Sequence, residues 1–286
     1  MPKGTLTIRR KIKSITNTKK MTKAMELVSA SKMRRAVAAA VATRPYGLAA
    51  RDILTQLTPG SEYARHPFFR ERTVARVGVI VVGTNRGLCG SFNGVIAQKV
   101  MEVITEEQNA GAQDVELYTF GKRARDFLAR YGKGVFADFL KNDITTSVLD
   151  VIPLINLATE RFLNGTIDKV IIVYMDYISS VRQKPVAHLL MPLHTEKGRM
   201  HVEYMYEPTS EYVLEYVIPR LLESQVLQGV LESEASEHSS RMIAMHNASE
   251  AATDMLFDLR LTYNQIRQAG ITQEIAEITA GRAALE

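Results

Sequence analysis

The stretch SITNTKKMTKAMELVSASKMRRAV, residues 14–37, decides how the rest of the chain is interpreted. It holds six Lys and Arg residues against one acid, Glu26, and it contains neither Gly nor Pro. The absence of helix breakers favours a helix, yet the stretch lacks the wide apolar stripe that a helix buried against a globular core presents. The sequence therefore predicts a basic helix that packs along a narrow seam and needs a further partner for its charged surface.

Charge is distributed unevenly along the 286 residues. Residues 1–51 hold thirteen Lys and Arg with Glu26 as the one acid, whereas residues 223–286 hold ten acids and four bases. Residues 52–222 are close to neutral, with nineteen bases and twenty acids. The two ends have opposite charge, which suggests that they pair with each other.

Both ends run for long distances without proline, and the C-terminal run is interrupted by Gly229, Gly270 and Gly281, each of which costs about 1 kcal/mol relative to Ala in a helix. Residues 5–43 contain neither Gly nor Pro, and a helix of that length spans about 58 Å. The sequence RPYG at 44–47 predicts a kink or an end, and residues 48–57 predict a second helical run. After Pro219 no proline follows for 67 residues, which is enough for a helix of about 100 Å. Such a helix exceeds the diameter of a small domain.

The apolar spacing indicates how these helices pack. Steps of three and four residues along the C-terminal helix form a coiled-coil seam, which comprises Leu231, Ala235, His238, Met242, Met245, Ser249, Ala252, Leu256, Leu259, Tyr263, Ile266, Gly270, Gln273, Glu277 and Ala280. A thinner stripe on the N-terminal helix comprises Ile8, Ile12, Ile15, Thr22, Met25, Ser29 and Ala36. Because both stripes are narrow, we expect the termini to form a projecting antiparallel coiled coil. The alternative is that both helices lie on the surface of the central domain.

Residues 74–208 have the strand–helix alternation of an α/β domain. The β-branched run VARVGVIVVG at 74–83 predicts a strand buried on both faces. Further strands are expected at 115–121, 168–178, 184–193 and 200–208, and helices at 95–109, 122–132 and 147–164. The predicted architecture is a Rossmann-like α/β domain at 74–208 with a long antiparallel coiled coil of the N- and C-terminal helices, at 1–57 and 209–286.

The motifs of the central domain do not predict catalysis. The loop TNRGLCGSFNG at 84–94 stands where a phosphate-binding loop would, but its glycines lack the G-x-G-x-x-G spacing and no Gly-Lys-Ser/Thr follows. A tight strand-to-helix turn is the simpler interpretation. The six His residues lack metal-ligand spacing, and the single cysteine, Cys89, excludes an internal disulfide. We expect no catalytic, metal or cofactor site.

On composition alone, the basic helix leaves three kinds of partner open: nucleic acid, an anionic membrane surface and an acidic protein. No stretch of the sequence approaches the roughly 18 consecutive apolar residues of a membrane span. A phosphate-binding enzyme would show nucleotide affinity in the isolated chain. A nucleic-acid-binding protein would show strongly salt-dependent binding.

Three segments resemble one known family. They are IRRKIKSITNTKKMTKAMELVSASKM at 8–33, RGLCGSFN at 86–93, and ASEHSSRMIAMHNASEAATDMLFDLRLTYNQIRQAGITQEIAEITAGRAAL at 235–285. Together they resemble the γ subunits of bacterial F-type ATP synthases. The resemblance implies a central-stalk rotor without a catalytic site or cofactor of its own, whose coiled coil stands inside a ring of α and β subunits. Its α/β domain would carry ε and rest on the membrane ring of c subunits, so the chain would be peripheral at the cytoplasmic face of the cell membrane.

The resemblance also implies residue roles. Contact with the catalytic β subunits is expected for Lys19, Lys20, Lys23, Met25, Arg267, Gln268 and Thr272. Stabilisation of the coil is expected for Arg241, Leu256, Leu259, Glu274 and Glu277, the two glutamates near Met25 on the opposite helix. Contact with the c ring is expected for Tyr204, Tyr206 and Glu207. Because the resemblance begins at Ile8, we expect no cleaved targeting segment. His238, Ser239, Ser240 and His246 depart from the family pattern, and their role is left open.

Overall fold

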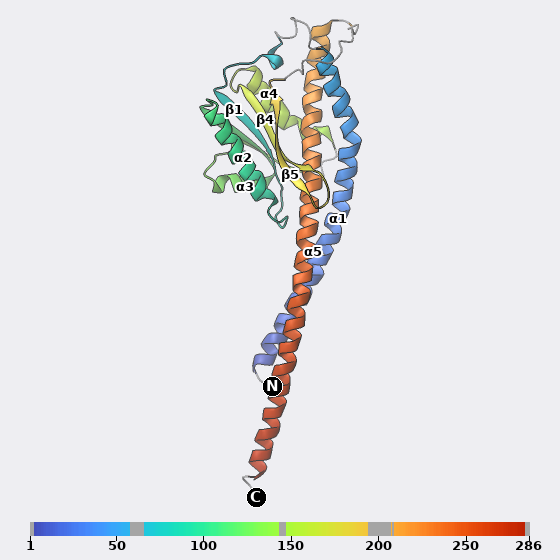
Figure 1. Cartoon of the computed structure of the whole chain (residues 1–286), viewed down its shortest axis with the longest axis vertical. Helices are drawn as coiled ribbons and strands as arrows, with labels where there is room; N and C mark the ends of the chain where they lie inside the picture. Colours follow the sequence, from blue (N-terminus) through green and yellow to red (C-terminus); the bar gives the residue numbers. More distant parts are fainter. Residues whose placement is uncertain (1–2, 58–65, 143–146, 194–206, 208, 284–286) are drawn as a thin grey trace. The chain divides into compact units, whose positions relative to one another are not determined.

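The computed structural model describes residues 3–57, 66–142, 147–193, 207 and 209–283 (Figure 1). The chain divides into two compact units. The helix-pair unit consists of residues 1–29 and 241–286, and the sheet unit consists of residues 30–240. The boundary between the units therefore falls within the terminal helices, away from the limits at 57, 74 and 208 that the sequence suggested.

The two terminal helices are continuous through both units. Helix α1 spans Lys3–Leu57 and helix α5 spans Ser210–Ala283. Pro45 lies inside α1 and Pro219 inside α5. The RPYG sequence therefore does not end the first helix, and residues 48–57 continue it. A proline removes one backbone hydrogen bond of a helix, and the remaining bonds carry the helix through this point.

The sheet has five strands in the order β3-β2-β1-β4-β5. Strands β3, β2, β1 and β4 are parallel, and β5 is antiparallel to β4. This order confirms the Rossmann-like architecture. The strands are β1 Arg76–Val82, β2 Asp114–Phe120, β3 Ala137–Phe139, β4 Lys169–Tyr177 and β5 Gln183–Met191. The three-residue strand β3 was not predicted, and the strand expected at 200–208 lies outside the described residues, apart from Glu207.

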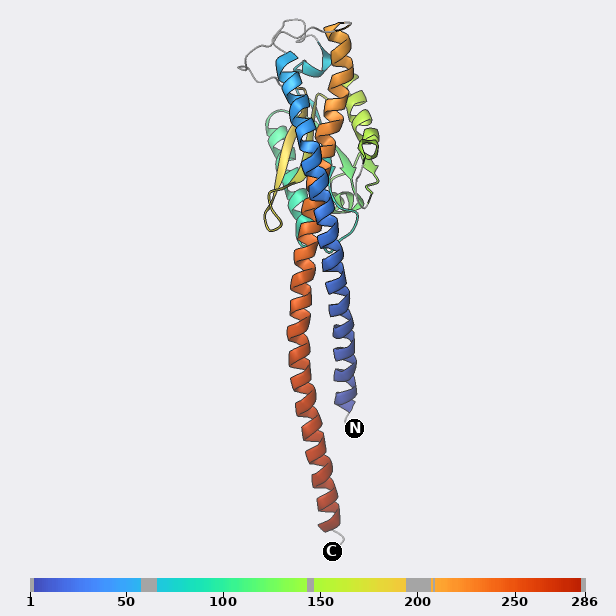
Figure 2. The same ribbon diagram turned by 90° about the vertical axis from the view of Figure 1, so that its right-hand side faces the viewer.

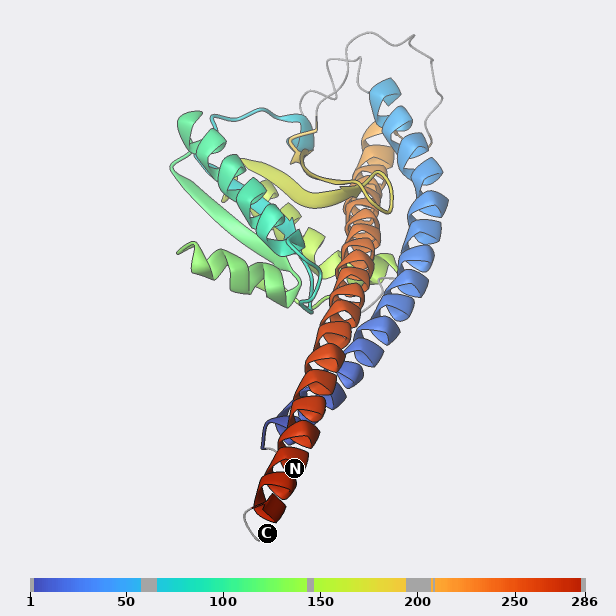
Figure 3. The same cartoon turned by 60° about the horizontal axis from the view of Figure 1, so that its bottom comes forward.

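Strand β1 is buried on both faces, as its sequence predicted. Its residues Val77, Val79 and Val81 pack against α2 (Phe92–Asn109) and α3 (Lys122–Arg130). Figure 3 shows these two helices on the side of the sheet away from α5. Two short 3-10 helices, η2 (Pro67–Phe69) and η3 (Val148–Asp150), complete the described elements of this unit together with α4 (Ile152–Leu163).

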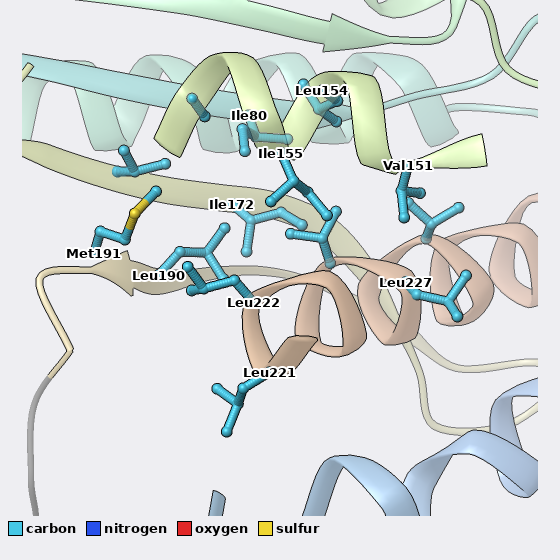
Figure 4. Packing of buried hydrophobic residues seen from close by; sticks show 14 of the residues in the cluster. Ile80, Val151, Leu154, Ile155, Ile172, Leu190, Met191, Leu221, Leu222 and Leu227 are labelled. Atoms are coloured by element: carbon cyan, nitrogen blue, oxygen red, sulfur yellow. The ribbon is translucent and has the colours of Figure 1, made fainter. Parts of the chain in front are cut away.

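The other face of the sheet carries the larger core, which includes the first half of α5. Figure 4 shows Ile80 of β1, Ile155 of α4, Ile172 of β4, Leu190 of β5 and Leu222 of α5 in one cluster. All five side chains are buried. The N-terminal part of α5 is therefore a core element of the sheet unit.

Within the helix-pair unit, α1 and α5 lie side by side and run antiparallel (Figure 2). The amino and carboxyl termini consequently lie toward the same end of this unit. This arrangement confirms the antiparallel pairing that was predicted from the two narrow stripes.

Candidate functional site: the helix pair and its outer surface

The seam between the two helices follows the predicted stripes. On α5, Met245, Ser249, Ala252 and Leu256 are buried, while Leu259, Tyr263 and Ile266 are half-buried. On α1, Ile8, Ile12, Ile15, Thr22 and Met25 are half-buried and Ser29 is buried. Neighbouring positions on both helices are mostly exposed. Each helix therefore buries a single stripe, as a two-stranded seam requires.

The predicted seam differs from the structure between Leu231 and His238. Every residue from 229 to 239 is buried, so this segment has no exposed face. It belongs to the sheet unit, where α5 packs against the sheet, and its heptad spacing does not mark a two-stranded seam. The heptad spacing was a poor guide here because it depends only on which positions are apolar. It therefore does not show that the polar residues between those positions are buried as well.

A histidine and a glutamate define the register of the helix pair. His246 Nδ1 lies 3.3 Å from Glu26 Oε1, and His246 Nε2 lies 3.3 Å from Glu250 Oε1. Lys23 Nζ donates to Glu26 Oε1 at 2.9 Å. The hydrogen bond from Lys23 lowers the pKa of the Glu26 carboxyl below its ordinary value of 4.5, and the contact with His246 adds to this effect. His246, whose role the sequence left open, thus contacts the opposite helix.

This register corrects one expectation about the coil. Position 246 of α5 stands opposite position 26 of α1, and Glu274 follows 28 residues later, which is about 42 Å along a helix. Glu274 and Glu277 therefore do not lie beside Met25. Both side chains are exposed, and Glu277 accepts a hydrogen bond from Gln273 at 2.9 Å. Of the other residues expected to stabilise the coil, Arg241 and Leu256 are buried and Leu259 is half-buried.

The outer face of α1 carries basic side chains that α5 does not neutralise. Lys20 is exposed, Lys19 and Met25 are half-buried, and Lys23 is paired with Glu26. Within the described part of the chain, no ion pair is made by Arg9, Arg10, Lys11, Lys13, Lys19 or Lys20. Arg44 of the basic end does pair with Glu232 in the sheet unit, but these six bases are not neutralised by the acids of α5 as the composition suggested. Their surface is therefore available to an acidic partner.

Three glutamates of the acidic segment 223–286 form ion pairs within the sheet unit. Glu232 pairs with Arg44 at 3.4 Å, and Glu234 and Glu237 pair with Lys141 at 3.7 and 2.8 Å. All of these residues belong to the sheet unit. The acidic charge of this stretch thus binds α5 to its own domain.

The last turns of α5 are exposed all round. The side chains of residues 271–282 are all exposed, as are Arg267 and Gln268. The Thr272 hydroxyl donates to the Gln268 carbonyl of its own helix at 3.0 Å. The sequence interpretation overlooked three isoleucines here, Ile271, Ile275 and Ile278, which are 48%, 59% and 73% exposed. Their spacing of four and three residues was the available signal, since it places them on one helix face.

The loop after strand β1 is held together by its own hydrogen bonds. Thr84 donates to the Arg86 carbonyl at 2.8 Å, and Asn93 Nδ2 donates to Thr84 Oγ1 at 2.9 Å. Leu88 and Gly90 adopt left-handed conformations, with φ of 63° and 60°. These contacts close the loop on itself as the tight turn that was predicted.

The remaining expected sites can be placed only in part. Glu207 is exposed, and Tyr204 and Tyr206 lie outside the described residues. Among the described residues, no group of three or more His, Cys, Asp or Glu side chains is placed to hold a metal ion. None of the described helices combines the length and the hydropathy that crossing a membrane requires.

Comparison with known proteins matches nearly the whole chain to one family. A family model described as ATP synthase matches residues 5–285. The ATP synthase gamma chain of Herpetosiphon aurantiacus is 40% identical over 288 aligned positions, covering 97% of each chain. The ATP synthase gamma chain of Legionella pneumophila (strain Corby) is 37% identical and that of Cupriavidus necator is 39% identical, each over 99% of both chains.

Solved structures support the fold. A chain from the Euglena gracilis mitochondrial ATP synthase (OSCP/F1/c-ring, rotational state 3) matches with a TM-score of 0.69 at 18% identity, covering 99% of this chain and 94% of that one. A chain from the Tetrahymena thermophila mitochondrial ATP synthase (central stalk/c-ring) matches with a TM-score of 0.63 at 21% identity, covering 80% of this chain and 99% of that one.

Proposed function

Because this chain belongs to the ATP synthase gamma-chain family, we propose that it is the central-stalk rotor subunit of an F-type ATP synthase. In this role it transmits torque from the ion-driven c ring to the catalytic β subunits. The reaction, ATP synthesis or hydrolysis, belongs to the complex, and the chain contributes no catalytic group.

The observation that carries this proposal is the outer surface of the helix pair. The two helices bury one narrow seam between them, and six basic side chains on α1 have no ion-pair partner among the described residues. A shaft that turns past several identical partners needs contacts that form and break at each step. Exposed charge pairs, each worth about 0–1 kcal/mol, meet this requirement, whereas a deep apolar pocket would hold the shaft at one angle.

The proposed contact residues are those that the family resemblance implies. Lys19, Lys20, Lys23 and Met25 would face an acidic loop of each β subunit in turn. Arg267, Gln268 and Thr272 would form hydrogen bonds with β near the C-terminal end of α5. Their exposure on α5 supports this. The exposed Ile271, Ile275 and Ile278 also require apolar cover, which the surrounding ring of α and β subunits would provide.

The sheet unit would form the foot of the rotor. It would bind the ε subunit and rest on the c ring, with Tyr204, Tyr206 and Glu207 as contacts to the polar loops of c. The chain would touch the membrane only through that ring, as a peripheral subunit at the cytoplasmic face of a bacterial cell membrane. The exposure of Glu207 is compatible with this contact.

Coexpression with the α and β subunits tests the proposal directly. The expected result is a complex that copurifies at fixed stoichiometry and hydrolyses ATP, while the isolated chain binds no nucleotide. With the complex immobilised through β, a bead attached at exposed Lys122→Cys should rotate stepwise during hydrolysis, once buried Cys89 has been replaced by Ser. A chain that instead binds ATP alone, or binds nucleic acid with a steep salt dependence, would contradict the proposal.

A further inference from the structure

Lys141 occupies a buried position where three parts of the sheet unit meet. It lies in the loop after β3, and its Nζ atom donates to Glu237 Oε2 of α5 at 2.8 Å. The same nitrogen lies 3.4 Å from the Gly83 carbonyl oxygen, just after β1, and 3.7 Å from Glu234 Oε1. The three side chains are 3%, 1% and 9% exposed for Lys141, Glu234 and Glu237. A single buried cation therefore joins the sheet to the long helix.

Further polar contacts connect the same turn of α5 to the sheet. Ser236 Oγ donates to the Met175 carbonyl of β4 at 3.2 Å. Ser239 Oγ donates to the Ser180 carbonyl in the loop that joins β4 to β5. Asn85 Nδ2 donates to the carbonyl of Lys141 itself. The segment SEASEHSS at 233–240 is polar in sequence, and much of its polarity is directed at the ends of β1 and β4.

This position is the topological switch point of the sheet. The chain leaves β1 toward β2 on one side, and β4 lies on the other side of β1. In open α/β sheets a crevice forms outside the carboxyl ends of two such strands, and ligands bind there. In this chain Lys141 and the Glu234–Glu237 turn of α5 fill that place. The crevice is used to hold a helix of the same chain.

The geometry restricts movement of α5 in two directions. Glu234 and Glu237 lie three residues apart, on one face of the helix, so rotation of the helix about its axis would separate both from Lys141. Sliding by one turn, about 5.4 Å, would also leave a buried charge without its partner, which is strongly unfavourable. The small side chains of Ala235, Ser236 and Ser239 would not resist such a movement by shape alone. Directional contacts to Lys141 do resist it.

We propose that Lys141 is a positioning residue that clamps α5 to the sheet, so that torque passes between the sheet unit and the helix without slip. This rests on the proposed rotor function. The charged residue contributes to coupling, beyond any contribution to folding, because it fixes the rotation and the axial position of the helix that carries the torque.

The first experiment measures how firmly Lys141 holds α5 in the isolated full chain, without partners. Hydrogen exchange is compared between the parent chain, Lys141→Met and the charge-retaining Lys141→Arg. Lys169→Met is the control, because Lys169 also makes an ion pair in the sheet unit, a partly buried one with Glu107 at 2.6 Å, but does not contact α5 through it. Amides 234–240 should exchange several-fold faster in Lys141→Met, and at the parent rate in Lys169→Met. Unchanged exchange at 234–240 in Lys141→Met would overturn the clamp whatever the function of the chain.

The second experiment measures the coupling of ion pumping to ATP hydrolysis, with the complete enzyme in membrane vesicles. The ratio of ATP-driven ion pumping to ATP hydrolysis should fall several-fold with Lys141→Met and recover with Lys141→Arg, while Lys169→Met leaves it unchanged. If Lys141→Met does not fold, Glu237→Gln takes its place, since Lys141 then keeps Glu234. A parent-like ratio together with faster exchange overturns the positioning role. Failure of the parent chain itself to assemble or support pumping would instead contradict the proposed function.

Discussion

The two halves of helix α5 are stabilised in different ways. From 221 to 239 almost every residue is buried, including four glutamates and four serines. From 246 to 282 only a stripe is buried or half-buried, and the last twelve of these residues expose every described side chain. The first half is richer in buried polar groups, and the second half exposes large apolar residues such as Phe257 and Ile278.

This difference shows that hydrophobicity alone does not determine which part of a long helix lies in the core. In the sheet unit, Glu232, Ser236 and Glu237 of α5 are buried with ion pairs or hydrogen bonds to Arg44, the Met175 carbonyl and Lys141, which offset their desolvation. In the helix pair, apolar groups are exposed because a single neighbouring helix covers only one stripe. The exposed half has a surface suited to partners, whereas the buried half is suited to anchoring.

The largest expected effect compares a core leucine with a seam leucine. Leu222 is 1% exposed in the sheet unit and Leu256 is 6% exposed in the helix pair. Leu222→Ala should lower the free energy of unfolding by about 2–5 kcal/mol. Leu256→Ala and Leu259→Ala should cost less, since exposed neighbours let the seam relax. Urea unfolding of the isolated chain measures the free energy for all three variants, and thermal melting of the assembled complex shows whether the seam changes also matter there. Equal costs at 222 and 256 would abolish the distinction between core and seam.

Alanine substitutions at two glycines of α5 test the distinction between its packed and exposed halves, because they should change the melting temperature in opposite directions. A Cβ atom at Gly229 would lie 3.1 Å from Cδ1 and 3.2 Å from Cε1 of Tyr174, whereas one at Gly281 would meet nothing within 4 Å. Alanine gains up to about 1 kcal/mol over glycine in a helix interior, but overpacking costs about 1–3 kcal/mol. Gly229→Ala should therefore lower the melting temperature, and Gly281→Ala should leave it unchanged or raise it. A stabilising Gly229→Ala would mean that α5 is loosely packed on the sheet.

The exposed half should affect turnover more than assembly. Arg267→Ala removes a proposed contact with β, and an exposed pair worth up to about 1 kcal/mol corresponds to at most about a fivefold loss of ATP turnover. Arg260→Ala is the matched control, because it lies on the same face two turns nearer the sheet unit. Turnover is measured with the assembled complex, and subunit content by gel densitometry. Full turnover in Arg267→Ala, with normal assembly, would exclude this contact.

The smallest expected effect concerns pH in the helix pair. The pKa of Glu26 is lowered in the folded chain by Lys23 and His246, so its stabilising contribution is fully present above about pH 4.5 and is lost as the pH falls through the lowered value. Because the group is near the surface, the contribution should stay below about 1 kcal/mol. Melting temperatures of the parent chain and Glu26→Gln should differ slightly at about pH 6 and converge at about pH 3. A difference that persists in acid would assign the effect of the substitution to packing.

The sequence by itself determined the elements whose cause is local. Long runs with few Gly and Pro residues predicted both long helices, although each helix also contains a proline. Narrow stripes at steps of three and four predicted the seam from Met245 to Ile266, and the β-branched run at 74–83 predicted the doubly buried strand β1. Each of these depends on neighbours within a few residues, so periodicity records it. The exposed basic side chains of α1 were also visible in composition, although their lack of acidic partners on α5 was not.

Only the tertiary structure decided what depends on residues far apart in the chain. Lys141 meets Glu237 across 96 residues, and Glu26 meets His246 across 220. The first contact accompanies the burial of the polar segment at 233–239, and the second sets the register that places Glu274 far from Met25. A polar residue in a helix has the same local signature whether water or a buried lysine satisfies it. The free energy that separates the two outcomes comes from desolvation and pairing in the folded state, which no spacing along the sequence records.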